Sequence, residues 1–272
     1  MPARLKAVVE VAAVFCLTLL LVALVSLSPA GRWERRAVGR PFLEYAVMIA
    51  VPVLLLAIGR RGFSPYGLSL RHLPFHLDMT ASAFIPVALA GAAVAIVDHR
   101  SWSGALVLAA AKTAALFALG LMLRRKPARG EDGLLAGALF VAAFSNFAVK
   151  LSLGDVAASF LFYVFFLGLG EELLFRGYIQ SRLNEAFGRP LRFFGVRWGW
   201  GAIIASAFFG LMHVLNLGGL SSGVWTPAWW WGFWTFFGGL VFAFVREKTG
   251  SIAAPALLHG LPQAIAAAFL GR

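Results

Sequence analysis

The sequence predicts an all-α protein that crosses a membrane several times, as a polytopic bundle of about 8–9 spanning helices. Composition is the first indication, because 60% of the residues are hydrophobic and only 13% are charged, whereas soluble domains carry about 25% charged residues. The second is a series of apolar runs, several of which reach the length of about 20 residues that a spanning helix requires. The third is that short polar connections marked by Gly and Pro separate these runs.

The first apolar run covers about residues 7–28 and follows the basic residues Arg4 and Lys6. It is too long for the core of a typical signal peptide, so we expect an uncleaved first spanning helix. Further spans are expected near 41–59, 77–97, 103–123, 133–150, 156–177, 200–217, 228–245 and 251–270. No long linker divides the chain, which predicts one integrated membrane domain, with N-terminal helices in 1–150 and catalytic helices in 151–272.

The formal charge of +12 comes mostly from short arginine-rich loops. With the N-terminus inside, Lys and Arg are more numerous on the inner side, which predicts an N-in, C-out protein of the inner (plasma) membrane. The lipid bilayer is the expected partner of these charges, and no nucleic acid is expected, because no basic stripe carries interleaved aromatic residues. Cys16 is the only cysteine, which excludes an internal disulfide and a cysteine-based metal cluster.

The stretch 168–180 reads GLGEELLFRGYIQ and follows an apolar run. Ionisable groups inside a bilayer cost roughly 3 kcal/mol or more each, so they usually serve a function. Helix geometry separates the two adjacent glutamates. Glu172 and Arg176 are four residues apart and are expected to pair on one face, whereas Glu171 is turned by about 100° and keeps a free carboxylate.

Glu10, Lys112 and Glu44 also interrupt apolar runs. We expect them to extend toward the interface or to pair with one another inside the bundle, rather than to take part in catalysis. The connection 181–197 mixes arginines with phenylalanines, which predicts an amphipathic segment on the inner membrane surface. A group of tryptophans near Pro227 predicts an interfacial anchor, with a rim that contacts the substrate as the alternative. They are Trp225, Trp229, Trp230, Trp231 and Trp234.

Two histidines lie inside later apolar spans, His213 one turn after Phe209 and His259 one turn before Gln263. Peptide hydrolysis needs a base, a group that orients water, and donors where the oxyanion develops. Glu171 is the candidate base, and His213 is the candidate orienting group. His259 and the amide of Gln263 are the candidate oxyanion donors.

The same groups allow a metal-dependent alternative. Two histidines and a carboxylate form a common zinc set, here Glu171, His213 and His259, with metal-activated water in place of the protein-oriented one. The histidines lack the HExxH spacing of the common metalloproteases. Glu172 is expected to be occupied by Arg176, which leaves few groups to orient a metal-binding histidine. We therefore expect no cofactor, with zinc as the alternative.

Three motifs occur in order: Glu-Glu-x-x-x-Arg at 171–176, Phe-x-x-x-His at 209–213 and His-x-x-x-amide at 259–263, the last preceded by Thr-Gly-Ser-Ile at 249–252. With these motifs the chain resembles the CAAX-processing and bacteriocin-processing (CPBP) intramembrane proteases, relatives of the Ras-converting CAAX prenyl protease. Residues 1–150 match only as generic membrane helices. The resemblance implies a helical bundle with a cavity that opens into the membrane, and a glutamate-activated water.

Carried over to this chain, the resemblance implies a role for each matching residue. Glu171 would be the base, Glu172 and Arg176 the supporting pair, His213 the partner that binds water, and His259 part of the oxyanion site. The family usually has asparagine where this chain has Gln263. The extra methylene shifts the amide, and catalytic rate is sensitive to placement on that scale. Either the local backbone compensates, or the oxyanion site is built differently, or activity is lower.

Together these observations predict an intramembrane endopeptidase that hydrolyses a peptide bond of a membrane-associated protein or peptide. A bacterial-type composition, rich in Ala, Arg and Gly, favours a sorting tail, a peptide precursor or a bacteriocin over a prenylated substrate. One alternative is a non-catalytic membrane scaffold or immunity protein that keeps the motif for folding. Another is a transporter, which ranks lower because the polar residues concentrate in the last four helices and no repeat is visible.

Overall fold

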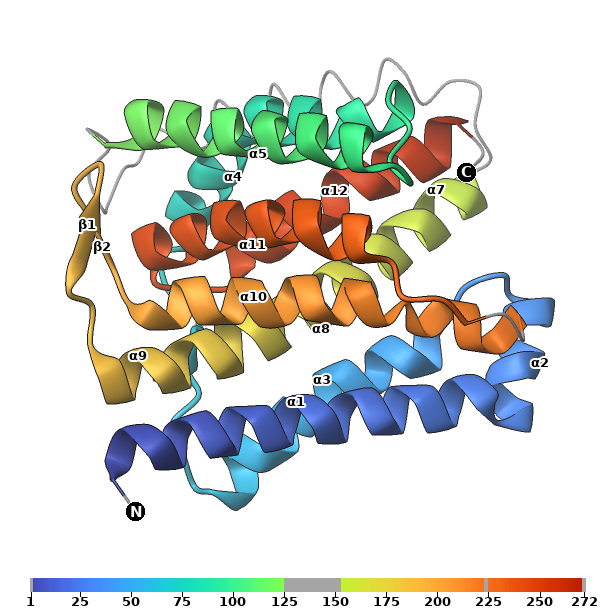
Figure 1. Cartoon of the computed structure of the whole chain (residues 1–272), viewed down its shortest axis with the longest axis horizontal. Helices are drawn as coiled ribbons and strands as arrows, with labels where there is room; N and C mark the ends of the chain where they lie inside the picture. Colours follow the sequence, from blue (N-terminus) through green and yellow to red (C-terminus); the bar gives the residue numbers. More distant parts are fainter. Residues whose placement is uncertain (1, 125–152, 223–224, 271–272) are drawn as a thin grey trace.

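The computed structural model describes residues 2–124, 153–222 and 225–270, and these residues are almost entirely helical (Figure 1). The all-α prediction is therefore confirmed. The span predicted at 133–150 lies outside the described residues. The total number of spans and the division of the chain near residue 150 stay predictions.

The helices follow the apolar runs in order. The N-terminal part contains α1 (Ala3–Leu27), α2 (Pro29–Ala37), α3 (Phe42–Ile58), η1 (Ser64–Tyr66), α4 (Leu73–Ala92), η2 (Ala93–Ala95) and α5 (Trp102–Leu123). The C-terminal part contains α7 (Leu153–Phe160), η4 (Leu161–Gly168), α8 (Leu169–Glu172), η5 (Leu173–Gln180), α9 (Ser181–Phe187), β1 (Leu191–Phe193), β2 (Val196–Trp198), α10 (Trp200–Leu215), η6 (Leu217–Ser222), α11 (Trp229–Thr249) and α12 (Ala253–Leu270). Local signals set several ends. Pro29 begins α2, and Gly250 in a left-handed conformation ends α11.

Several of these helices match a bilayer in length and hydropathy. Five stretches are long and apolar enough to cross a membrane, and α3 is apolar but shorter. The five are Ala3–Leu27, Leu73–Ala95, Trp102–Leu123, Gly154–Phe187 and Trp200–Leu220. Large hydrophobic side chains point outward from the bundle, among them Ile58, Ile85 and Ile96, which are 78%, 67% and 84% exposed. Such faces require lipid around them, so the chain is a multi-pass membrane protein.

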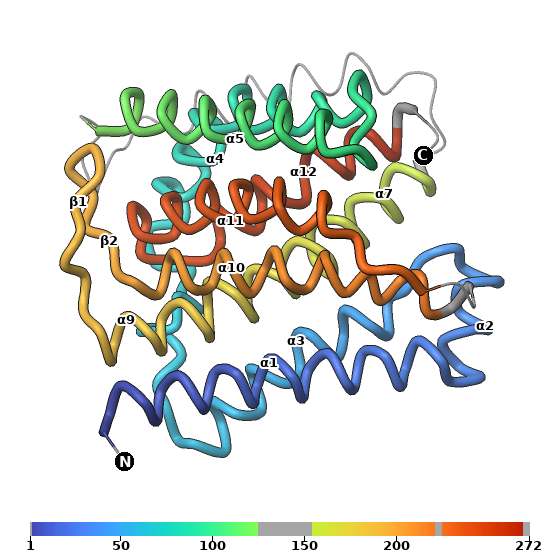
Figure 2. The backbone as a smooth tube through the Cα atoms, viewed as in Figure 1, coloured from blue at the N-terminus to red at the C-terminus, as the bar shows by residue number. Residues whose placement is uncertain are grey.

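The bundle has two large apolar cores, and the stretch 168–180 contributes side chains to the second of them. In Figures 1 and 2, α1 and α3 lie on one side, α4 and α5 lie on the other, and α10 and α11 lie between. One core joins α4, α5, α11 and α12, and includes Phe242. The other joins α1, α3, η5 and α10, and includes Phe209. Polar groups from the middle helices therefore meet at the boundary of the two cores.

The helix that carries the two glutamates is not a regular α-helix. Two π-helical segments, η4 and η5, flank the short α8 that contains Glu171 and Glu172. In a π-helix each N–H bonds to the carbonyl five residues back, and such segments are rare and frequent at functional sites. Every residue of η5 is buried. The 3.6-residue period assumed from the sequence therefore does not hold along the whole stretch.

The segment 181–197, which was predicted to be amphipathic, forms a short helix and a hairpin, and its location on the inner membrane surface stays a prediction. The helix continues as α9, and the chain then forms an antiparallel hairpin of β1 and β2. Phe194 and Gly195 have φ of +47° and +80°, as the turn of a two-residue type I′ hairpin requires. Trp198 at the end of the hairpin is buried, with its ring centroid 6.0 Å from that of Phe244 on α11. Burying this large ring in the core holds the segment against the bundle.

Glu10 and Glu44 pair inside the bundle, but with arginines and not with Lys112. The pairs are Glu10 with Arg61 at 2.6 Å, Glu10 with Arg182 at 3.0 Å, and Glu44 with Arg35. The helices α1 and α3 lie on the opposite side of the bundle from α5 (Figure 1). The carboxylates therefore meet the arginines of nearby helices and loops, and the expectation that these three residues pair with one another is wrong.

Candidate active site

Two glycines allow α12 to cross η4 at close range. A Cβ on Gly260 would lie 2.2 Å from the carbonyl oxygen of Tyr163, and a Cβ on Gly168 would lie 2.6 Å from that of Ala256. Only residues without a side chain permit this approach. The crossing places His259, the neighbour of Gly260, against the glutamates of α8.

Glu172 and Arg176 form a buried ion pair, as their spacing predicts. Arg176 Nη1 donates to Glu172 Oε1 at 2.9 Å, and both side chains are 0% exposed. Arg176 Nη2 also donates to the carbonyl oxygen of Gly239 at 3.0 Å. The guanidinium carbon lies 4.5 Å from the ring centroid of Phe209 and 5.4 Å from that of Phe242. The pair therefore links η5 to both α10 and α11.

His259 lies between the two glutamates. Its Nδ1 is 3.0 Å from Glu172 Oε1, and its Nε2 is 3.7 Å from Glu171 Oε2. The ring stacks on Phe242 with centroids 4.7 Å apart. Because the carboxylate of Glu172 also accepts from Arg176, Nδ1 is the donor in its contact with Glu172. The remaining nitrogen, Nε2, faces Glu171.

Glu171 and His259 are close enough to interact electrostatically, but they do not form a direct hydrogen bond. The 3.7 Å between His259 Nε2 and Glu171 Oε2 exceeds the length of an N–H···O hydrogen bond. Glu171 Oε2 is buried and has no hydrogen-bond partner among the described residues. A polar ligand in the cavity would supply the missing hydrogen bond.

His213 presents one nitrogen for a ligand. Its Nδ1 donates to the carbonyl oxygen of Phe209 at 2.8 Å, because a carbonyl can only accept. In the neutral ring, Nε2 is then an acceptor. The ring is held edge-on between Phe209 and Trp231, at centroid distances of 4.6 and 4.9 Å. His213 is therefore oriented to accept a hydrogen bond from water.

Glu171, His213 and His259 line one cavity of about 380 Å³. This volume falls in the range typical of ligand sites, about 300–1,000 Å³. The rest of the wall is mostly apolar and aromatic, from α3, α4, α5, η4, α10, α11 and α12. Glu172 and Arg176 are not among the lining residues, and they contact the cavity wall through His259, Phe209 and Phe242.

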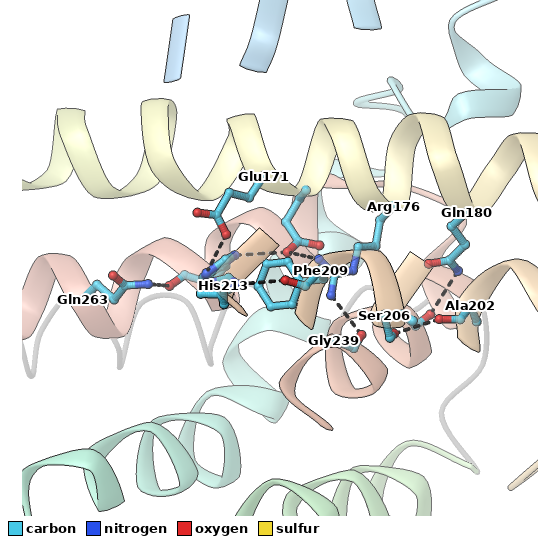
Figure 3. A network of polar contacts seen from close by, with 12 residues as sticks. Glu171, Arg176, Gln180, Ala202, Ser206, Phe209, His213, Gly239 and Gln263 are labelled. Atoms are coloured by element: carbon cyan, nitrogen blue, oxygen red, sulfur yellow. Dashed lines mark hydrogen bonds and ion pairs between the residues drawn. The ribbon is translucent and has the colours of Figure 1, made fainter. Parts of the chain in front are cut away.

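Gln263 lines the same cavity, but its amide is partly occupied. Its Nε2 donates to the carbonyl oxygen of His259 at 3.3 Å (Figure 3). A side-chain amide has two N–H donors, so one is still available. The oxyanion role expected for Gln263 stays a prediction.

Residues 153–265 match the family described as type II CAAX prenyl endopeptidase Rce1-like. This segment belongs to the CAAX-protease family. No curated protein and no solved structure matches the chain significantly. The matched segment contains all six candidate site residues, and family membership implies CAAX-type intramembrane protease activity on membrane-associated protein substrates.

The zinc alternative depends on how the two histidines of the CAAX-protease segment are held. Both use Nδ1 for a protein contact, which leaves Nε2 on each as the nitrogen that could bind a metal. Within residues 2–124, 153–222 and 225–270, no group of three His, Cys, Asp or Glu side chains is placed to hold a metal ion. One premise from the sequence is wrong, however. Glu172 binds His259 as well as Arg176, so a histidine does have an orienting carboxylate. Metal independence stays a prediction.

The tryptophan group divides into two parts. Trp225 and Trp229 are 46% and 59% exposed, as interfacial anchors are expected to be. Trp231 and Trp234 instead line the cavity of the CAAX-protease segment. Residues 231, 234, 235, 238 and 242 recur at helical spacing on α11, and all five line the cavity. That spacing was the signal in the sequence that could have separated the two groups.

Two polar side chains in the cavity wall come from outside the CAAX-protease segment, and sequence reasoning missed them as site residues. Tyr45 on α3 donates from its hydroxyl to Glu171 Oε1 over a long 3.5 Å. Lys112 on α5 also lines the cavity. Tyr45 gave one signal in the sequence, because a hydroxyl inside an apolar span requires a hydrogen-bond partner.

We expect Tyr45→Phe to lower kcat/KM by about 3- to 10-fold, because a neutral hydrogen bond contributes about 0.5–1.5 kcal/mol. Steady-state cleavage by the purified variant in liposomes measures this. Tyr66→Phe is a matched control, because its hydroxyl bonds Arg61 away from the cavity. Unchanged activity in the Tyr45 variant would show that this hydroxyl does not influence Glu171.

Proposed function

We propose that the protein is an intramembrane endopeptidase in which Glu171 activates a water molecule to cleave a membrane-associated peptide. The observation that most supports this is the position of His259, between Glu171 and the buried ion pair, in the wall of a mostly apolar cavity. In the state with Glu171 ionised and His259 protonated, a base and a cationic donor face the same space. Acyl hydrolysis requires this combination.

In this proposal His213 positions the water. Its free Nε2 accepts one hydrogen bond from the water, and Glu171 accepts the other. Glu171 removes a proton as the water oxygen attacks the carbonyl carbon of the substrate. The same proton then passes to the departing amine, which restores Glu171 and leaves a new carboxylate.

The oxyanion is stabilised by His259 in this scheme. Glu172 holds Nδ1 of His259, so Nε2–H points into the cavity and can donate to the developing negative charge. Arg176 holds the side chain of Glu172 in place through their ion pair, and both act as positioning residues. The free N–H of Gln263 is a second candidate donor.

We infer that the substrate reaches the cavity from the bilayer. Val87, Gly91 and Val94 of α4 and η2 line the cavity, while Ile85 and Leu89 of α4 are each 67% exposed on its outer face. The lipid-facing helix α4 thus forms part of the cavity wall. The end of a lipid-anchored peptide would have to pass only this helix to enter the cavity from the bilayer. The excess of inner-side Lys and Arg supports location in the inner membrane.

Cleavage by purified protein in liposomes tests the proposed function. The probes are a peptide ending in a prenylated cysteine and three aliphatic residues, as the family description suggests, and an unprenylated peptide tail anchored by a spanning helix. In H₂¹⁸O, mass spectrometry should find one ¹⁸O in the new carboxylate. No cleavage of either probe in any lipid would favour the non-catalytic scaffold, and cleavage without ¹⁸O would exclude direct hydrolysis by water.

We expect activity to survive exhaustive chelation, since the described residues do not present three ligands to one ion. Cleavage is measured before and after dialysis against a strong chelator, with elemental analysis of the same sample. Less than stoichiometric zinc and unchanged kcat/KM are the expected results. Activity that is lost on chelation and returns with low micromolar zinc would instead assign Glu171, His213 and His259 to a metal site.

A further inference from the structure

Lys112 carries a positive charge into the cavity without an acidic partner. It lies half-buried on α5 and lines the cavity that contains Glu171. Glu10 and Glu44, the other charged residues that interrupt apolar runs, are each paired with arginine. Within the described part of the chain, Lys112 has no hydrogen bond or ion pair, and its Nζ rests 5.0 Å from the ring centroid of Trp234.

The space around Lys112 is shaped by α11. A Cβ on Gly238 would lie 3.3 Å from Lys112 Cδ and 3.7 Å from Nζ, so glycine at this position leaves room for the lysine side chain. The indole Nε1 of Trp234 is also a buried donor with no acceptor among the described residues. Two donors next to each other are therefore unused in one wall of the cavity.

A buried cation without a counter-ion is costly, and a cation–π contact offsets only about 0.5–2 kcal/mol of that cost. Such a site is suited to an anionic ligand. No Arg and no second Lys is among the cavity-lining residues of the described chain. The cavity thus has a carboxylate with two histidines in one part of its wall and a lone ammonium in another.

We propose that Lys112 binds a carboxylate of the peptide substrate and so selects peptides cleaved near their C-terminal end. This rests on the proposed function, because it assigns the substrate of the same cavity. A carboxylate accepts hydrogen bonds from an ammonium and an indole N–H together, which matches the two unused donors. A cavity of about 380 Å³ has room for a short peptide end. The C-terminal carboxylate of such an end would then reach Lys112 while an upstream peptide bond lies at Glu171.

Binding, measured separately from cleavage, tests this inference. The full chain carrying Glu171→Gln is placed in liposomes and titrated with three lipid-anchored peptides that differ only at the C-terminal residue. One has a free C-terminal acid, one has a C-terminal amide, and one has the amide with glutamate as its last residue. We expect the acid to bind roughly 10- to 100-fold more tightly than the amide, as for other charge-assisted hydrogen bonds.

Two further variants carry a second substitution in the Glu171→Gln background. The preference for the acid should disappear when Lys112→Gln is added and persist when Lys112→Arg is added. Trp234→Phe, which keeps the ring and removes the N–H, should weaken the preference by a few fold. Tight binding of the third peptide would show that Lys112 recognises an acidic side chain. Weak binding would show that it recognises the C-terminal carboxylate.

Two results would overturn the inference. One is equal binding of acid and amide. The other is an equally large preference for the acid over the amide in the Lys112→Gln variant, which would indicate that the lysine is only a distant counter-ion of Glu171. The proposed hydrolysis is tested separately, because binding is measured on an inactive variant and cleavage on the wild-type chain. If the wild-type chain cleaves no probe, the proposed hydrolysis fails whatever the binding results are.

Discussion

The Glu171→Gln variant is expected to fold normally and to lose cleavage, with kcat/KM lower by roughly 10²–10⁴-fold. Glutamine keeps the shape of the side chain and can still accept from Tyr45, whose hydroxyl is 3.5 Å from Glu171 Oε1. It cannot take a proton from water. The electrostatic interaction with His259 also weakens, because a neutral amide attracts the donor N–H of the ring less strongly than a carboxylate does. The base and the oxyanion donor are therefore impaired together.

Cleavage rate and thermal stability in detergent, measured on the same preparation, check this prediction. Glu185→Gln is the matched control, because the Glu185 side chain is 67% exposed and pairs only with Arg182 at 3.4 Å. It should have wild-type values in both assays. If Glu171→Gln cuts peptide at the wild-type rate, Glu171 is not the base and the proposed mechanism fails.

Glu172→Ala is expected to act mainly on folding, at a cost of about 3–5 kcal/mol, because it leaves Arg176 buried without its charge partner. Both side chains of this pair are 0% exposed. The substitution also frees Nδ1 of His259, so activity should fall in whatever protein does fold. Folded yield and the melting temperature of the purified protein measure the first effect.

A second substitution separates charge from packing. Glu172→Leu with Arg176→Met removes both charges and should recover most of the stability, because an apolar pair avoids the desolvation cost. It should not recover activity, since His259 still lacks its orienting carboxylate. For comparison, Glu185→Ala at the exposed pair should cost about 0–1 kcal/mol. Equal stability loss in the single Glu172 and Glu171 variants would contradict the separate roles assigned to the two glutamates.

The predictions that were right depended on short-range rules. The apolar runs became α1, α3, α4, α5 and α10 at nearly the expected positions, because the length and hydropathy of a spanning helix are local properties. The Glu172–Arg176 pair followed from a spacing of four residues. His213 and His259 were noticed because polar groups inside apolar spans are rare. None of these steps required knowledge of which helices pack together.

The features that the sequence did not predict depend on packing between distant elements. The phenylalanine- and arginine-rich connection 181–197 was expected to be amphipathic, but its hairpin and the burial of the following Trp198 were not foreseen. Glu10 was expected to extend toward the interface or to pair with Glu44 or Lys112, but the order of the helices places arginines nearer to it. Sequence patterns carry little information about such neighbours, because many arrangements bury the same apolar area.

The sequence by itself determined that this is a helical membrane protein with one ion-paired glutamate and a second, catalytic candidate beside it. Only the tertiary structure decided that His259 lies between Glu171 and Glu172, since this depends on α12 and η4 crossing where Gly168 and Gly260 have no side chains. Likewise, only packing brought Lys112 from α5 into the same cavity. Spacing along one helix follows from the repeat of the backbone, whereas contacts between helices depend on which side chains leave room at the crossing.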